Sequence, residues 1–519
     1  MTKSFLRIFF LFFFIIPEFF VCRIMSQERQ WVLTPKNISS ALAEDSILAA
    51  SDTLRPAFHL VPPAGCMGDP NGGIYHQGWY HIFYGLQPFS SSPGGWYWAH
   101  ARSRDLLIWE HTPPTHTPAF EFGLDAVGSG STITAADGHV YAFYSAAGKD
   151  GKMKFWQARF NSDLSAWQHS AVNPVLTLDQ PGIPPFDRFW RDPFVFTAGG
   201  RTFLIACADL FEADDVSVPI FEARNAQLTQ WEYKGIMFTY PKYKARNLEV
   251  PELRKLGNKW ILLASTDAPV DRCLYFIGNF DVNSLKFIAE KEGIIDYSGH
   301  YYAQETIRDD KGNLYLMAWI PGWDRDWLPA YMNSPLKNSS PLWNGCFALP
   351  RQLMIDPDGS LVQKPVDVLK QLRTVHRVIE GHDLPVTSAF TAYDVIEEIK
   401  GNQLEIKMEM DLHHASFCGI NVLCNREGRK GLFICWSGSM INVDGVIVPL
   451  PEWKQGQTLR LHIFIDRQLV EVFINEGRYC VSRKVQPECI GGRYIALTRL
   501  GGTARLVSLE AWQLKAVRP

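Results

Sequence analysis

An aspartate in a tightly constrained turn is the first residue whose setting suggests chemistry. Asp69 stands between Gly68 and Pro70, and the pair Asn71-Gly72 follows. Pro70 fixes its own φ and biases the preceding aspartate towards an extended conformation, while an Asn-Gly pair favours a turn. Held where a strand meets a turn, Asp69 has the placement that a nucleophilic carboxylate needs. The alternative is an aspartate that merely caps a hairpin.

Two further carboxylates occupy unusual positions later in the chain. Asp192 follows Arg191 inside an otherwise apolar run at 189–196, where a buried charge is costly unless it is paired or used. Neighbours in a strand point to opposite faces, so we expect this pair not to neutralise itself; two separate salt bridges are the alternative. Glu249 precedes a predicted strand, and Glu252 offers a second carboxylate in the same turn. A surface glutamate in a loop is the alternative there.

Short strand-like runs with regular turns surround all three carboxylates. Aromatic and β-branched runs follow glycine-containing turns along residues 55–360, as at 138–145, 201–206 and 259–264. Many short strands of this kind form a sandwich, a barrel or a propeller. The runs recur roughly every 60 residues, which suits one propeller blade. Because the segment is too long for one sandwich, we expect residues 55–360 to form a five-bladed β-propeller.

A second β domain is expected after the propeller. Residues 361–379 have the pattern of a linker with a helical piece. Beyond it, apolar and polar residues alternate at 404–410 and 458–466, which gives each strand one buried and one solvated face. Residues 380–519 have the length of one β-sandwich. The predicted fold class is all-β, with a propeller followed by a C-terminal sandwich.

The N-terminal segment resembles an export signal. Lys3 and Arg7 precede an apolar run that is too short and too interrupted for a good membrane span. No small-x-small cleavage site follows, so a signal peptide or signal anchor at 1–24 and a start of translation at Met25 all stay open. Residues 25–54 are predicted to be a polar leader with a short helix. We expect a secreted or periplasmic protein with no membrane span apart from an N-terminal anchor.

The composition disfavours several classes of partner. The chain has 519 residues, a net charge of −3 and no long basic run, which argues against nucleic acid. Its 10 cysteines are scattered, without a C-x-x-C pair or a Cys/His cluster at zinc spacing, so neither a metal nor another cofactor is predicted. One or two disulfides would fit an oxidising compartment. The 17 tryptophans would suit stacking on sugar rings as well as core packing.

Three short motifs together resemble a known enzyme family. Gly-Asp-Pro-Asn-Gly at 68–72, Arg-Asp-Pro at 191–193 and Glu-x-Pro at 249–251 are similar to the signature motifs of glycoside hydrolase family 32, which contains invertases, inulinases, levanases and fructosyltransferases. Phrases at 296–304, 349–353 and 466–475 also match, the last in what is the family's C-terminal sandwich. The similarity extends over both predicted domains in the right order. It implies a five-bladed propeller with an appended sandwich.

The resemblance implies a role for each carboxylate. Asp69 would be the nucleophile and Glu249 the general acid/base, while Asp192 would bind sugar hydroxyls and stabilise the transition state. Retaining glycosidases need two carboxyl groups about 5 Å apart, one ionised and one protonated. A propeller brings residues that are distant in sequence together around one central funnel. The implied partner is a carbohydrate: sucrose, a fructo-oligosaccharide or a fructan.

The resemblance also implies a set of substrate-binding residues. Arg191 could anchor a sugar hydroxyl and keep nearby carboxylates ionised. Trp98 belongs to a Trp-Ala-His phrase, and Ser129 and Ser131 to a Gly-Ser-Gly-Ser phrase, each similar to a family phrase. The complete predicted set is Asn71, Gln87, Trp98, Ser129, Ser131, Arg191 and Trp323. Trp323 belongs with Trp96 to an aromatic set that could line the leaving-sugar side, and core or rim packing is the alternative.

Glycines replace larger residues at three positions of the family pattern. Gly68 stands for an asparagine, Gly85 for a glutamine and Gly128 for a phenylalanine. These positions resemble contacts to the bound fructosyl unit, and the loss of one polar contact to a sugar hydroxyl costs about 1–3 kcal/mol. We therefore expect a pocket that is wider or less hydrogen-bonded than in an ordinary invertase, unless other side chains fill the space.

The predicted function is a retaining glycoside hydrolase that cleaves terminal β-D-fructofuranosyl linkages through a covalent fructosyl-enzyme intermediate. A fructosyltransferase is the nearest alternative, because the intermediate can react with water or with another sugar. A carbohydrate-binding protein that has lost efficient turnover is favoured by the three glycines and disfavoured by the three carboxylates. A five-bladed arabinofuranosidase is disfavoured by the phrase at 466–475.

Overall fold

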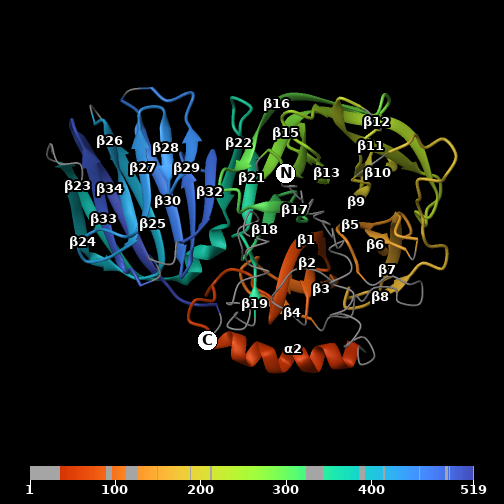
Figure 1. Cartoon of the computed structure of the whole chain (residues 1–519), viewed down its shortest axis with the longest axis horizontal. Coiled ribbons are helices and arrows are strands. Elements are labelled where there is room, and N and C mark those ends of the chain that lie inside the picture. Colours follow the sequence, from red (N-terminus) through yellow and green to blue (C-terminus); the bar gives the residue numbers. More distant parts are fainter. Residues whose placement is uncertain are drawn as a thin grey trace, which may run out of the picture.

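A computed structural model gives the fold, and it describes residues 35–88, 96–112, 126–148, 150–186, 189–210, 213–269, 271–322, 343–384, 392–412, 415–454, 456–485, 489 and 491–517. Figure 1 shows two β-rich bodies side by side, with helix α2 (Pro35–Ala50) alongside the larger one. Strands β1 to β22 form the larger body and β23 to β34 the smaller one. The prediction of a β-propeller followed by a C-terminal β-sandwich is confirmed.

Sheets of consecutive antiparallel strands build the propeller. Within the described residues, the first two sheets contain β1 (Gly65–His76), β2 (Trp79–Gln87), β3 (Tyr97–Ser103) and β4 (Trp109–His111), then β5 (Gly130–Thr134), β6 (Val140–Ala147), β7 (Met153–Phe160) and β8 (Trp167–His169). The third and fourth contain β9 (Arg191–Ala198), β10 (Arg201–Cys207), β11 (Asp215–Ala223) and β12 (Trp231–Pro241), then β13 (Glu249–Leu256), β14 (Lys259–Thr266), β15 (Arg272–Asp281) and β16 (Lys286–Asp296). The fifth contains β17 (Tyr302–Arg308), β18 (Leu314–Ile320), β20 (Cys346–Phe347), β21 (Arg351–Ile355) and β22 (Leu361–Pro365).

The first strands of these sheets form a closed ring. β1 contacts β5, β5 contacts β9, β9 contacts β13, β13 contacts β17, and β17 contacts β1. A short late strand, β19 (Trp343–Asn344), also pairs in parallel with β1. A cycle of innermost strands is the arrangement of a propeller, in which neighbouring sheets pack face to face. Residues at the beginnings of different inner strands therefore come close in space although they are far apart in sequence.

The inner strands begin irregularly. Register shifts interrupt β1, β13 and β17 near their first residues. Three non-glycine residues in these strands or in β9 have left-handed backbones: φ is +58° at Asp192, +42° at Val250 and +50° at Ala303. Bulges and left-handed residues re-aim side chains and locally end regular pairing, at a cost that the surrounding fold must offset. The chain therefore departs from regular β geometry at the ring centre.

The junction between the two bodies is shorter than expected. Within 361–379, β22 still belongs to the fifth propeller sheet and β23 (Arg373–Leu384) already belongs to the sandwich. The predicted helical piece is the 3-10 helix η5 (Asp367–Leu372) between them. A strand of five residues such as β22 shows too little alternation to be distinguished from a linker by sequence.

Two six-stranded sheets face each other in the sandwich. One contains, in spatial order, β23, β34 (Ala504–Leu514), β25 (Gln403–Asp411), β30 (Thr458–Asp466), β31 (Leu469–Ile474) and β32 (Tyr479–Lys484). The other contains β24 (Ala392–Lys400), β33 (Tyr494–Leu500), β26 (Phe417–Cys424), β27 (Leu432–Ser437), β28 (Met440–Val443) and β29 (Val446–Pro449). The apolar residues of the alternating strands β25 and β30 are buried in one core shared by both sheets, as predicted from their pattern.

Buried charges join the sandwich to the segment that leads into β1. Asp466, at the end of β30, accepts hydrogen bonds from the main-chain N–H groups of Ala57 at 2.7 Å and Phe58 at 2.9 Å. The ring nitrogens of His59 lie 2.7 Å from Asp466 Oδ2 and 3.0 Å from Glu471 Oε1. All three charged side chains are almost fully buried. The sandwich therefore holds the first propeller blade in place through its lead-in segment.

Candidate active site

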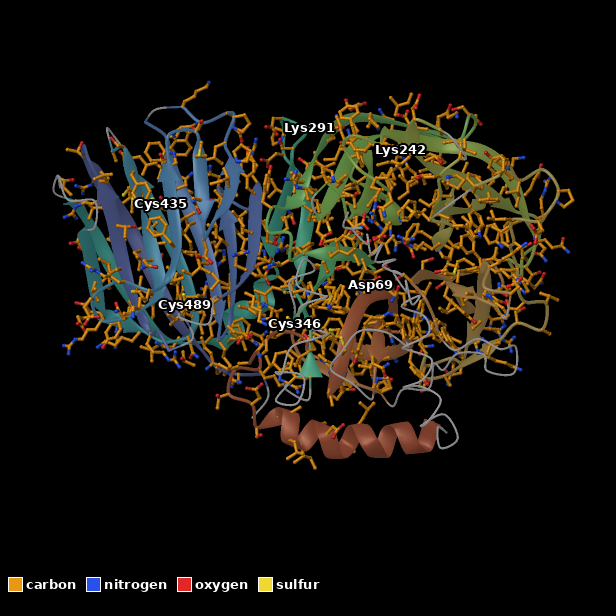
Figure 2. The ribbon with its side chains drawn as sticks, viewed as in Figure 1. Asp69, Lys242, Lys291, Cys346, Cys435 and Cys489 are labelled. Carbon is orange, nitrogen blue, oxygen red and sulfur yellow. The ribbon has the colours of Figure 1, made fainter. Side chains whose placement is uncertain are left out.

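Asp69 lies at the bulge of β1, inside the propeller (Figure 2). Ser129 Oγ donates a hydrogen bond to Asp69 Oδ2 at 2.7 Å. Asn71 Nδ2 donates to the main-chain oxygen of Asp69 at 2.8 Å, and Asn71 Oδ1 accepts the N–H of Gly130 at 2.9 Å. The turn and the next blade thus hold both the backbone and the carboxylate, so this aspartate is positioned as a nucleophile requires.

Asp192 begins the inner strand of the third blade and is only 5% exposed. The N–H of Val250 donates to Asp192 Oδ2 at 3.0 Å, which ties the third blade to the fourth. Burial raises the pKa of Asp192 to about 7; Arg191 lowers it, and the charges of Glu249 and Asp69 raise it. The three predicted carboxylates therefore share one electrostatic environment.

The expectation that Arg191 and Asp192 point to opposite faces is wrong. Arg191 Nε lies 3.6 Å from Asp192 Oδ2. The φ of +58° at Asp192 takes the residue out of the extended conformation on which the alternation rule depends. The guanidinium therefore lies beside both its neighbour's carboxylate and Glu249.

Glu249 opens β13 and receives hydrogen bonds at both oxygens. Arg191 donates to Oε1, as does Asn247 Nδ2 at 3.1 Å, and the hydroxyl of Tyr302 donates to Oε2. The nearby charges of Glu249 and Asp192 raise the pKa of Arg191, although burial alone would lower it, so the guanidinium stays charged. Groups from β9, β13 and β17 thus converge on one carboxylate.

Asp192→Asn is expected to stabilise the fold at alkaline pH. A carboxyl group whose folded pKa of about 7 exceeds its unfolded value destabilises the protein progressively between pH 4 and pH 7, and fully above pH 7. An asparagine removes that cost, so we expect about 1–2 kcal/mol of extra stability at pH 8 and almost none at pH 4. Urea unfolding at both pH values tests this, and an equal effect at both would contradict the raised pKa.

Glu252, the second carboxylate of the Glu249 turn, lies outside this cluster. It is 1% exposed, and its carboxylate accepts hydrogen bonds from Arg254 Nε at 2.7 Å and from the N–H of Thr306 at 3.0 Å. Glu305 lies in the same buried region, and its Oε1 accepts the N–H of Gly73 at 2.7 Å. These carboxyl groups link β1, β13 and β17, so their geometry supports a structural role.

The predicted sugar-binding residues fall into different environments. Trp98 is fully buried, stacks on Phe83 and donates its indole N–H to the oxygen of Gly128 at 3.0 Å. Ser131 Oγ donates to Pro193 O at 2.9 Å and accepts the N–H of Val195 at 3.0 Å, which ties β5 to β9. These contacts suit packing and blade alignment.

Ser129 and Arg191 instead contact the carboxylates directly, and Asn71 binds the main chain of Asp69 and Gly130. Gln87 ends β2 opposite Cys66 and is partly exposed. Trp323 lies outside the described residues. The sequence motifs thus did not distinguish residues that contact a carboxylate from residues that pack between blades, and sugar binding by these residues stays a prediction.

Other groups fill the space beside all three glycines. A Cβ at Gly68 would lie 3.0 Å from the ring of Trp96, and one at Gly85 would lie 3.3 Å from the same ring. At Gly128 it would lie 2.7 Å from the oxygen of Ser145. The expectation of a wider pocket is therefore wrong at these positions, whereas a pocket with fewer hydrogen-bonding groups stays a prediction.

Two contacts of Glu249 were not predicted, and Trp96 was expected only as a residue that could line the leaving-sugar side. Tyr302 and Asn247 bind Glu249, and Trp96 packs on the glycines next to Asp69. Tyr302 is the first residue of β17, and its only sequence signal is the run 296–304, which resembles a family phrase. A tyrosine or tryptophan in a strand-rich sequence is usually read as core packing, so sequence pattern alone does not single it out.

The described residues also bear on the predictions about metals, disulfides and membrane spans. In the described parts of the chain, no group of three or more His, Cys, Asp or Glu side chains could hold a metal ion. The nine cysteines of these parts are all buried and no disulfide joins any two of them, so none of the disulfides that we considered occurs there. No helix among the described residues is long and apolar enough to span a membrane.

The chain matches one family over most of its length. Residues 59–365 match the glycosyl hydrolases family 32 N-terminal domain, and residues 369–513 match the C-terminal domain of the same family. The chain belongs to glycosyl hydrolase family 32. The two matched segments correspond to the propeller and the sandwich of this family 32 protein, and the carboxylate cluster lies in the first.

Relatives and solved structures cover the family 32 chain almost completely. A raffinose invertase of Escherichia coli is 28% identical over 89% of this chain and 96% of its own length. A levanase of Bacillus subtilis is 27% identical over 92% of this chain and 73% of its own length. The crystal structure of fructan 1-exohydrolase IIa from Cichorium intybus has a TM-score of 0.77 at 18% identity, covering 89% of this chain and 98% of that one. The last comparison supports the fold.

Proposed function

We propose that this family 32 protein hydrolyses terminal β-D-fructofuranosyl linkages of sucrose or fructans with retention of configuration. One observation carries the assignment: three inner strands place Asp69, Asp192 and Glu249 in one electrostatic cluster, with a donor on each carboxylate. Relatives named raffinose invertase and levanase act on the same class of linkage, which supports this choice.

In the first step, Asp69 attacks the anomeric carbon of the fructosyl unit, and the bond to the leaving oxygen breaks. Glu249 gives its proton to that oxygen, so the leaving sugar departs as a neutral alcohol. A fructosyl ester of Asp69 forms with inverted configuration. Ser129, which donates to Asp69, holds the carboxylate for attack and would move its hydrogen bond to the ester carbonyl.

In the second step, water attacks the anomeric carbon and Asp69 leaves as a carboxylate, which restores the configuration. Glu249 takes the proton of that water. Arg191 and Tyr302 each donate a hydrogen bond to Glu249, so both of its carboxyl oxygens are held in place. Formation of the ester removes the charge of Asp69, which lowers the pKa of Asp192 and favours its ionised form beside the developing positive sugar.

The test is release of reducing sugar from sucrose, inulin and levan. We expect release from at least one substrate by the wild type and a loss of at least about 100-fold in kcat for Glu249→Ala, because a general acid/base contributes about 10²–10⁴. Trisaccharide formation at high sucrose concentration would point to the transferase alternative. A folded wild type that releases no fructose from any of the three would contradict the proposal and favour the binding-protein alternative.

We also propose that the protein is exported. The support is the sequence alone: two basic residues, Lys3 and Arg7, before an apolar run. Cell fractionation followed by N-terminal sequencing of the active protein tests this proposal. Activity confined to the cytoplasm of the source cell, with an intact N-terminus or a start at Met25, would contradict it.

A further inference from the structure

The structure leaves little room for a larger side chain at Gly68 or Gly85. Neither has a left-handed φ, so the backbone at both positions would accept any side chain. A Cβ at Gly68 would lie 3.0 Å from both Cη2 and Cζ3 of Trp96. A Cβ at Gly85 would lie 3.3 Å from Cε3 of the same ring. One indole therefore occupies the space that two side chains would need.

This indole lies next to the proposed nucleophile. The bulge of β1 sets Gly68 and Asp69 opposite Gly85 of β2, and a Cβ at Gly85 would be only 3.7 Å from the nitrogen of Asp69. The indole is packed partly against the apolar core of the first blade and is partly exposed. The oxygen of Trp96 accepts the N–H of Val127 at 2.8 Å, which holds the main chain in place. The main chain at Trp96 is thus held in place, and its ring lies against both glycines beside Asp69.

We propose that Trp96 contacts the sugar at Asp69 and sets the specificity of this pocket. The inference rests on the proposed function. An indole has no hydrogen-bonding group on its six-membered ring, so it favours the C–H face of a sugar or an apolar leaving group and offers nothing to a hydroxyl. Glycines at 68 and 85 offer no side chain either. On this side of the pocket, recognition is by packing on an apolar wall.

The first experiment separates binding from chemistry. Trp96→Ala removes the wall but no reacting group, so KM for the best fructoside substrate should rise at least about 10-fold with a smaller change in kcat. Trp96→Phe keeps a flat ring and should restore most of the affinity. Trp453→Ala, which alters a partly buried tryptophan of the sandwich, is the matched control and should leave KM unchanged.

The second experiment tests the shared space. In the wild type, Gly85→Gln places a side chain against the ring of Trp96, and kcat/KM or the melting temperature should fall markedly. In the Trp96→Ala background, the same change finds open space and should cost at least about 10-fold less in kcat/KM, or improve it. A variant that unfolds with the ring present but folds without it supports the proposal equally.

Two results would overturn the assignment of Trp96. One is an unchanged KM in a folded Trp96→Ala protein, and the other is an equal effect of Gly85→Gln in both backgrounds. Both require a wild type that hydrolyses a fructoside. A wild type with no activity on any fructoside would instead overturn the proposed function, so the two failures are distinguishable.

Discussion

Asp69→Asn is expected to lower kcat for fructoside hydrolysis by at least about 10³-fold while the protein stays folded. An amide is too weak a nucleophile to form the fructosyl ester, but its oxygen can still accept the hydrogen bond from Ser129. Steady-state kinetics with the best substrate, together with a thermal melt, check both parts. The control is Asp163→Asn, which alters an exposed turn aspartate bonded to Ser165 and should change neither quantity.

The smaller variant Asp69→Ala adds a test of the role itself. Azide is a small nucleophile that can enter the space of the missing carboxylate and attack the anomeric carbon, with Glu249 protonating the leaving oxygen. We expect partial recovery of substrate cleavage and a fructosyl azide of inverted configuration. If Asp69→Asn keeps more than about a tenth of wild-type kcat, another residue is the nucleophile.

Arg351→Met is expected to destabilise the protein by about 3–5 kcal/mol, because it leaves buried carboxylates without their cation. The guanidinium is completely buried, and it donates to Asp296 at 3.0 Å, Glu471 at 2.7 Å and Ser482 at 2.8 Å. These partners come from the fourth blade and from the sandwich, so the loss also weakens the contact between the two domains.

Denaturant unfolding of Arg351→Met measures this effect. Arg505→Met is the matched control, because Arg505 pairs with Asp383 on the exposed face of the sandwich and such pairs contribute about 0–1 kcal/mol. Equal losses from both changes would show that burial adds nothing to the Arg351 cluster. Activity measured below the unfolding transition should be retained, since the cluster contacts none of the proposed catalytic carboxylates.

The stability of the same region depends on pH through His59. Burial alone would lower the pKa of His59, but the hydrogen bonds from its ring to Asp466 and Glu471 outweigh burial and raise the pKa to about 9. The folded protein therefore holds a proton that the unfolded chain releases above pH 6.5. The stability from this group is complete below pH 6.5 and is lost as the pH rises towards 9. His59→Gln should remove this fall, as melting temperatures across that range would show.

The local motifs could be predicted from the sequence because turn formation and the setting of a charged residue depend on neighbouring residues. Asp69 was identified from the residues on either side of it, and Asp192 from a charge in an apolar run. Alternation over 404–410 and 458–466 predicted sandwich strands because the side-chain period of a strand is a local property. The short strand β22 was not predicted, because five residues are too few to show a clear alternation of apolar and polar side chains.

The sequence by itself predicted the class of fold, singled out the three carboxylates and indicated the type of chemistry. Only the tertiary structure decided that Glu252 is buried away from the cluster, that Arg191 lies beside Asp192 and Glu249, and that Trp96 fills the space at Gly68 and Gly85. The physical reason is range. A turn or an alternating strand depends on neighbours a few residues away, whereas these contacts depend on left-handed residues, bulges and blade packing that join distant segments.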